Sequence, residues 1–225
     1  MKAKLSIGLM VACVLCTASL NTLAQEGRGY FYKNTDRVFY GGFVAGINMP
    51  AIKNDIYDGY HMIGFNGGAV VYGRIFPRLF GSVEMLYSMK GCRGIRTFDS
   101  YYSGSFVERY FVDLNYVEIP FIFHFLINDK WNAGIGGAYA QLLKSKEELV
   151  TDQPVYLDPA KYPFEKKEYS IVIDGGMQLY HGWFVNVRYQ QSLNYIRDVN
   201  HVPVGYATGP QVNQVFSVRL MYLMN

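Results

Sequence analysis

Charged and hydroxyl side chains interrupt several apolar segments of this 225-residue chain. The clearest case is LNYVEIPFIFHF, residues 114–125, in which Glu118 and His124 stand among Leu, Tyr, Val, Ile and Phe. Burying an unpaired carboxylate is costly, so Glu118 needs a cation or a hydrogen-bond donor wherever it lies. Its chemistry therefore depends on the surface that its segment presents.

Nucleophilic catalysis would need a histidine within hydrogen-bond reach of a hydroxyl group. Ser192, Asp198 and either His61 or His201 fall near matching ends of the segments described below, whereas His124 falls near the opposite end. Such a set would suit an enzyme that acts on an ester or amide, but no sequence motif supports it. We therefore expect no enzymatic activity and keep the enzyme as an alternative.

The other reactive groups predict neither a metal site nor a cofactor. Acidic residues between positions 147 and 165 alternate with lysines, which is typical of a solvated loop. The glycine-rich words GGFVAGIN and GIGGAYA are not followed by a helix, so neither predicts a phosphate-binding loop. We expect these glycines to serve strand curvature and close packing.

Residues 1–24 are typical of a secretory signal peptide. Lys2 and Lys4 precede an apolar run, and small residues precede a cleavage site after Ala24. Loss of the two lysines lowers the formal net charge from +3 to +1 (3 − 2), so nothing suggests binding to nucleic acid. The mature chain then keeps a single cysteine, Cys92, which excludes an intramolecular disulfide and a cysteine zinc site.

Beyond residue 36 the chain is built from segments in which apolar and polar residues alternate. In FGSVEMLYSMKG, for example, Val83, Met85 and Tyr87 fall on one side of the segment. Glu84 and Ser88 fall on the other side. Strict alternation predicts a β-strand with one apolar face. The predicted strands lie at residues 37–48, 63–74, 79–91, 114–125, 131–144, 169–180, 183–194 and 212–224.

The stretches between these segments are alternately long and short. A soluble sandwich has no reason to place every long loop at one end, whereas an outer-membrane barrel has long outer loops and short periplasmic turns. The segments also match the roughly 9–11 residues that a tilted strand needs to cross a bilayer. The sequence predicts an all-β, eight-stranded, antiparallel up-and-down transmembrane β-barrel over residues 37–225, with a periplasmic lead-in at 25–36.

The lumen of such a barrel is just wide enough to be filled by side chains. We expect its carboxylates to be matched by arginine or lysine, because unpaired charges in a narrow lumen are costly. The predicted lumen ion-pair network consists of Glu84, Lys90, Glu118, Arg74, Arg188 and Arg219. Pro120 removes one backbone donor from its strand, so we also expect a local irregularity there.

A long predicted loop, residues 92–113, is rich in tyrosine and arginine, which are favoured in recognition surfaces. The candidate surface consists of Arg93, Arg96, Tyr101, Tyr102, Arg109, Tyr110 and Phe111. Such a surface would suit lipopolysaccharide phosphates or a protein partner in the cell envelope.

Four phrases resemble those of the PorT-like outer-membrane barrels and come in that family's order: SVEMLYSMKG, LNYVEIPFIFHF, GIGGAYAQLLKSK and VRYQQSLNYI. The resemblance covers nearly all of the mature chain. It implies the outer membrane of a Bacteroidetes-type bacterium and a link to protein secretion, because the founding member is associated with a secretion and gliding system. The ending MYLMN departs from the terminal aromatic residue that such barrels usually carry, which leaves Tyr222 as its substitute.

Together these observations predict an integral outer-membrane barrel with a side-chain-filled lumen and a structural or interaction role. Its expected surroundings are outer-membrane lipid and lipopolysaccharide. Two alternatives stay open, a lipid A-modifying enzyme and a soluble lipocalin-like carrier. The long strands and the one-sided long loops argue against the carrier.

Overall fold

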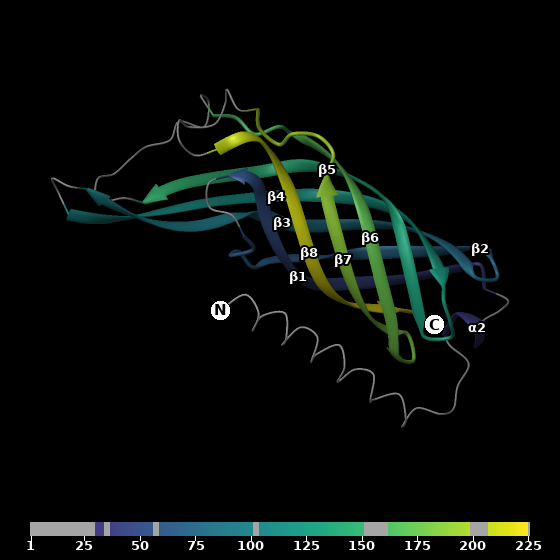
Figure 1. Ribbon diagram of the computed structural model, residues 1–225. Coiled ribbons are helices and arrows are strands. Elements are labelled where there is room, and N and C mark those ends of the chain that lie inside the picture. Colours follow the sequence, from purple (N-terminus) through teal and green to yellow (C-terminus); the bar gives the residue numbers. More distant parts are fainter. Residues whose placement is uncertain are drawn as a thin grey trace.

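Eight long antiparallel strands make up almost all of the computed structural model (Figure 1). It describes residues 30–33, 37–55, 59–100, 104–150, 162–198 and 207–224. The strands are β1 (Phe39–Asp55), β2 (Gly64–Phe76), β3 (Leu79–Ser100), β4 (Gly104–Leu126), β5 (Trp131–Val150), β6 (Lys167–Tyr180), β7 (Trp183–Ser192) and β8 (Ala207–Leu223). One short helix, α2 (Tyr30–Lys33), precedes them. Among the described residues, no helix is long and apolar enough to cross a membrane.

The strands form a closed barrel in which each pairs with its neighbours in sequence. The ring closes between the first and last strands, with register from Gly42↔Leu223 to Lys53↔Val212. The predicted eight-stranded up-and-down barrel is therefore confirmed. Closure leaves no free edge along the paired part of the sheet, which is the condition for crossing lipid with strands.

Alternating burial divides each strand into a lumen face and an outer face. In β4, Glu118, Ile122 and His124 are buried, whereas Phe121 and Phe123 are 47% and 44% exposed. The same alternation puts large apolar side chains on the outside of the other strands, which is the pattern of a lipid-facing surface. Glu118 thus lies on the lumen face of its strand, as the predicted lumen ion-pair network requires.

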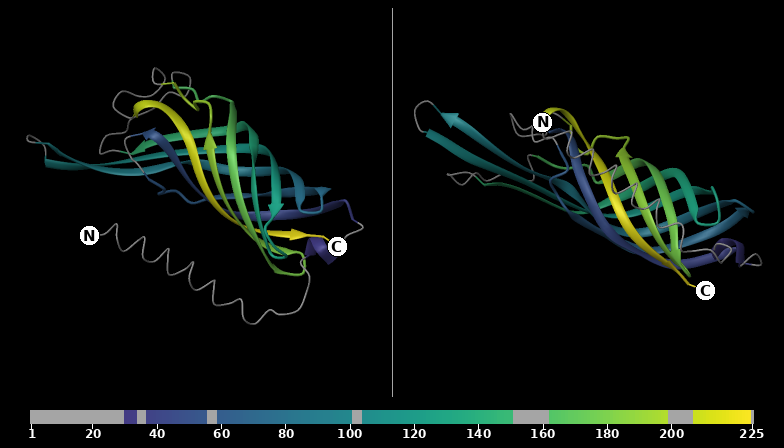
Figure 2. Two further views of the ribbon diagram at one scale, coloured as in Figure 1. Left: turned by 45° about the vertical axis from the view of Figure 1, so that its right-hand side comes forward. Right: turned by 60° about the horizontal axis from the view of Figure 1, so that its bottom comes forward.

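Both ends of the described chain lie at the end of the barrel that carries the short turns. The turns after β2, β4 and β6 are short, and Figure 2 shows the C-terminus beside α2 at this end. The other end carries the longer β1–β2, β5–β6 and β7–β8 connections, together with the β3–β4 connection, which spans only residues 101–103. We call them the short-turn end and the long-loop end.

Several strands are longer than predicted. Within the range 92–113, predicted as a loop, residues 92–100 and 104–113 are strand, and β1 and β5 also run beyond their predicted ends. Figure 1 shows β3, β4 and β5 projecting past the barrel at the long-loop end. Cys92 is thus a buried strand residue and not a loop residue. We call residues 91–100, 104–115 and 142–150 the β extension.

Pro120 and the strand glycines both affect how neighbouring strands pair. Next to Pro120, the β3–β4 pairs stop after Val83↔Phe121 and resume at Leu86↔Glu118 in the same register, so the expected irregularity is an interruption and not a bulge. Glycines permit close approach between strands, as expected. A Cβ on Gly136 would lie 2.0 Å from the carbonyl oxygen of Phe121.

Candidate functional site

The interior of the barrel is the candidate site, because it gathers the charged residues that interrupt the apolar strands. An apolar cluster rich in aromatic rings fills the short-turn end, and a second apolar cluster lies toward the long-loop end. Between them the lumen is lined by buried polar and charged side chains. Each faces inward because strand alternation sends every second residue to the lumen.

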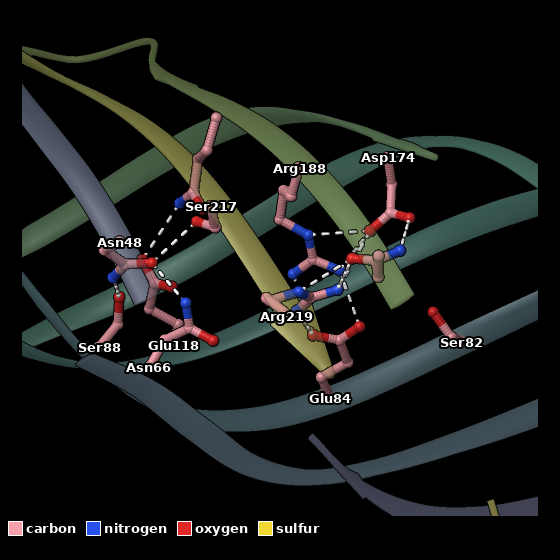
Figure 3. Close-up of polar contacts among 12 residues, drawn as sticks. Asn48, Asn66, Ser82, Glu84, Ser88, Glu118, Asp174, Arg188, Ser217 and Arg219 are labelled. Atoms are coloured by element: carbon pink, nitrogen blue, oxygen red, sulfur yellow. Dashed lines mark hydrogen bonds and ion pairs between the residues drawn. The ribbon is translucent and has the colours of Figure 1, made fainter. Parts of the chain in front are cut away.

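Arg188 of β7 is the centre of the first charged group. Its guanidinium donates two hydrogen bonds to Glu84, at 2.9 and 2.8 Å, and two to Asp174, at 3.0 and 2.8 Å. All three side chains are at most 3% exposed. Figure 3 shows the two carboxylates lying on either side of the guanidinium. Two-point contacts of this kind are the strong form of the arginine–carboxylate bond.

Arg219 of β8 completes this group. It donates to Glu84 at 2.9 Å and to Asp174 at 3.2 Å, and both its Nε and its Nη2 donate to Asn186. Asn186 in turn donates to Asp174. The group holds two carboxylates and two guanidiniums, so its formal charge is zero. We call these five residues the lumen network.

Lys90 of β3 forms a separate group nearer the long-loop end. Its ammonium contacts Glu118 and lies 2.7 Å from Glu168, and all three side chains are at most 3% exposed. Gln190 donates to Glu118 at 3.1 Å, and Asn213 donates to Glu168 at 2.7 Å. We call these five residues the lysine cluster. Its lysine faces two carboxylates.

Amide and hydroxyl groups provide a third polar group. Asn48 donates to Ser88 at 3.0 Å and accepts hydrogen bonds from Asn66 and from Ser217. These residues come from β8, β1, β2 and β3, which are consecutive in the ring, so the hydrogen bonds run along one side of the lumen (Figure 3). Neutral polar groups and ion pairs together occupy its middle.

Tyr30 and Phe31 of α2 close the short-turn end of the lumen. Both are buried, and the Phe31 ring packs at centroid distances of 4.6 Å from Phe80 and 5.2 Å from Tyr40. The Tyr30 hydroxyl donates to the carbonyl oxygen of Met224 at 2.8 Å. We call Tyr30 and Phe31 the aromatic stopper. The sequence predicted a lead-in here but gave no sign that it packs into the barrel.

Arg74 is placed differently from the prediction. The sequence assigns it to the carboxylates of the lumen, whereas its Nη2 donates to the carbonyl oxygen of Phe31 and to the hydroxyl of Tyr40. Its guanidinium also lies 5.4 Å from the centre of the Phe80 ring. Arg74 thus holds the aromatic stopper at the mouth of the lumen.

Arg197 anchors the long-loop end. It is fully buried, donates two hydrogen bonds to Glu147 at 2.9 and 2.7 Å, and stacks 3.5 Å from the centre of the Phe164 ring. Tyr110 also donates to Glu147. We call these four residues the outer clamp. Alternation could not reveal it, because Arg197 lies beyond the end of β7.

The predicted recognition surface is only partly a surface. Tyr110 is fully buried in the outer clamp, which corrects its assignment. Arg109 is exposed, and Arg93 is about half exposed, 3.8 Å from Asp113 and with its guanidinium 5.8 Å from the centre of the Phe111 ring. These residues lie on strands of the β extension, not on a loop. The side chains of Arg96, Tyr101 and Tyr102 lie outside the described residues.

The alternative catalytic set is not assembled in the described part of the chain. The Ser192 hydroxyl donates to the carbonyl oxygen of Asn194 at 2.7 Å, and no hydrogen bond there joins it to His61. His201 lies outside the described residues. A different pair, Ser82 and His124, is 2.8 Å apart. Both members are buried, and the second ring nitrogen of His124 has no described partner to orient it.

The described residues contain no group of three or more His, Cys, Asp or Glu side chains placed to hold a metal ion. The closed ring, the outward apolar faces and the polar lumen define the class of this protein. It is an integral β-barrel protein of the bacterial outer membrane.

The particular family follows from the sequence match. Residues 24–198 match the family model of the outer membrane protein beta-barrel domain, and the chain belongs to this family. In barrels of this class the short turns face the periplasm and the long loops face outside. No protein of curated function is significantly similar in sequence to this chain.

Solved outer-membrane barrels are similar at low sequence identity. Ail, the attachment invasion locus protein of Yersinia pestis, is 10% identical with a TM-score of 0.42, covering 84% of this chain and 100% of Ail. OprG from Pseudomonas aeruginosa is 9% identical with a TM-score of 0.37, covering 84% and 95% of the two chains. Neisserial surface protein A is 11% identical with a TM-score of 0.31, covering 82% and 96%.

Proposed function

We propose that this protein is a closed, non-conducting barrel that anchors an interaction surface at the outer face of the membrane. The observation that carries the proposal is the filled lumen. The aromatic stopper, the lumen network, the lysine cluster and the outer clamp occupy it from one end to the other. An ion or solute would have to displace buried side chains, many of them held in ion pairs, to pass.

Conductance tests the closed state. The mature chain, refolded and inserted into a planar bilayer, should show no stepwise current under conditions in which a general porin conducts. As a positive control for insertion, the same preparation should show the heat-dependent gel shift of a folded barrel. Steady unitary currents from correctly folded protein would overturn the proposal.

The proposal includes the absence of enzymatic activity. A structural role for Ser82 and His124 is supported by their burial and by the lack of a described partner that would orient the His124 ring. The Ser192 hydroxyl already donates a hydrogen bond to the carbonyl oxygen of Asn194. Mass spectrometry of lipid A from cells with and without the protein checks this directly. A change in acyl chains or phosphates would favour the lipid A-modifying enzyme.

The interaction surface is the β extension. It carries exposed Arg109, half-exposed Arg93 and exposed Ile95 on strands that continue past the barrel. Basic and apolar groups on paired strands suit a protein partner or the phosphates of lipopolysaccharide. A photo-cross-linking residue at Arg93 or Arg109 should capture a partner in intact cells, whereas one at His181, in the turn after β6, should not.

The PorT-like phrases support a more specific role, a contribution to protein secretion. Deleting the gene should then reduce the amount of exported cargo in the culture medium while leaving other outer-membrane proteins in place. Unchanged secretion would remove this role and leave the structural and interaction role intact.

A further inference from the structure

An open apolar groove of about 610 Å³ lies on the lipid-facing surface where β1, β2 and β3 run side by side. Ala45, Gly67 and Ala69 form its floor, and Phe43, Phe65 and Tyr87 are among its walls. Strand register explains the shape. Ala45 pairs with Gly67, so two small residues meet on neighbouring strands, while Ala69 pairs with the bulky Phe43.

The walls of the groove are side chains that stand out from the barrel. Phe43 is 61% exposed and Met85 is 63% exposed, although both are large and apolar. The Phe65 ring leans along β2 over Gly67, since a Cβ on that glycine would lie 2.7 Å from its Cζ atom. The groove is thus formed by large side chains that project on either side of small residues, and the backbone of the sheet is not displaced to form it.

We propose that this groove is a binding site for one acyl chain of an outer-membrane lipid. The groove belongs to the face that already contacts the bilayer, so acyl chains reach it without leaving the membrane. Apart from the Tyr87 hydroxyl its lining residues are apolar or small, so it offers no charged partner to a headgroup or to a charged peptide. An apolar cavity of roughly 150 Å³ is enough to hold a benzene molecule, so this groove has room for a segment of hydrocarbon chain.

Packing, and not the hydrophobic effect, would hold the chain there. Lipid tails are as apolar as the protein surface, so association within the membrane depends on van der Waals contact. A trough contacts an acyl chain on several sides, whereas a convex barrel surface contacts it on one. Each added atom contact contributes little by itself, but a chain in the trough gains many of them.

Filling the groove tests the proposal. Ala69→Phe and Ala45→Phe place a ring on the floor, and Val71→Phe adds similar bulk at the next lipid-facing position of β2, outside the groove. The full mature chain is reconstituted in nanodiscs of phosphatidylethanolamine that carries a photoactivatable diazirine in its acyl chain. Cross-linked peptides are then quantified by mass spectrometry, after the heat-dependent gel shift confirms that each variant is folded.

In the wild type, cross-links should concentrate on the peptides that contain residues 43–45, 65–69 and 85–87. Each floor variant should lower them about fivefold, because the ring removes the contacts that make the trough distinct from the rest of the face. Val71→Phe should leave them unchanged. Even labelling of all lipid-facing strands in the wild type would overturn the proposal, as would equal loss in Val71→Phe. Cross-links between two barrels through this groove would assign it to a second copy of the chain instead.

Discussion

Replacing Arg188 by Gln should strongly destabilise the barrel. The guanidinium makes four hydrogen bonds to Glu84 and Asp174, and its loss leaves these two carboxylates to share Arg219. Removing one partner of a buried ion pair costs about 3–5 kcal/mol, since an uncompensated charge stays behind. A protein domain is typically stable by about 5–15 kcal/mol, so this loss is a large share of the total.

The matched change Glu84→Gln separates charge balance from simple loss of contacts. Alone it leaves two guanidiniums facing one carboxylate, so it should also be severe. The double variant keeps one carboxylate, Asp174, and one guanidinium, Arg219, at 3.2 Å, and restores neutrality. We expect it to cost about 2 kcal/mol less than the sum of the two single changes, within the usual range for directly coupled residues.

Urea titration of the barrel folded into phospholipid vesicles measures these differences, with folding followed by the gel shift of unheated samples. Lys146→Gln is the control, because its partner Glu148 lies 2.7 Å away but both side chains are about half exposed. Its unfolding midpoint should match the wild type. Additive losses in the double variant, or a wild-type midpoint for Arg188→Gln, would refute the neutral network.

Three further changes probe other layers of the barrel. Phe31→Ala should open the short-turn end of the lumen. Position 82 is buried when the aromatic stopper is intact, so a Ser82→Cys thiol should react with maleimide only in the Phe31→Ala variant, as measured by peptide mass spectrometry. A thiol that stays protected in that variant would contradict the stopper. Phe121→Arg should cost about 2–4 kcal/mol in urea titration if this residue lies deep in lipid, and a smaller loss would place it near the interface. Lys90→Met leaves two buried carboxylates without a cation, whereas Glu118→Gln leaves one ion pair. Lys90→Met should therefore lower the stability of the barrel much more than Glu118→Gln. Equal urea unfolding midpoints for the two variants would contradict this.

The facing of the strands could be predicted from the sequence because burial imposes a period of two. Val83 and Glu84 lie on opposite faces in the structure, as their alternation requires. The same rule places Asp174 in the lumen, since it is two residues from buried Val172 in β6. The predicted network nevertheless lacks Asp174, because an apolar segment with a single carboxylate, SIVIDGG, gives no sign of a cation to match it. Glu168 was missing because it lies just outside the predicted bounds of 169–180.

Alternation along a strand could not predict which carboxylate pairs with which arginine in the lumen. Glu84 and Arg188 are 104 residues apart and meet because the ring closes with a particular strand tilt, which no single strand encodes. The aromatic stopper was missed for a related reason, since its short helix shows no periodicity. Most of the β extension falls in predicted loops, because its residues do not keep one continuous apolar face. Its polar residues on both sides resemble loop composition.

The sealed ends change what the lumen charges can do. In water, an arginine and a carboxylate attract weakly, whereas in a dry interior the same pair is strong and each unpaired member is costly. The stopper and the outer clamp cover the charged middle with buried apolar and aromatic side chains. That cover makes correct pairing between β3, β6, β7 and β8 a condition of folding, because a shifted register would leave a charge unmatched. A lumen used in this way specifies the closed ring, which is why we propose recognition only for the β extension and the lipid-facing groove.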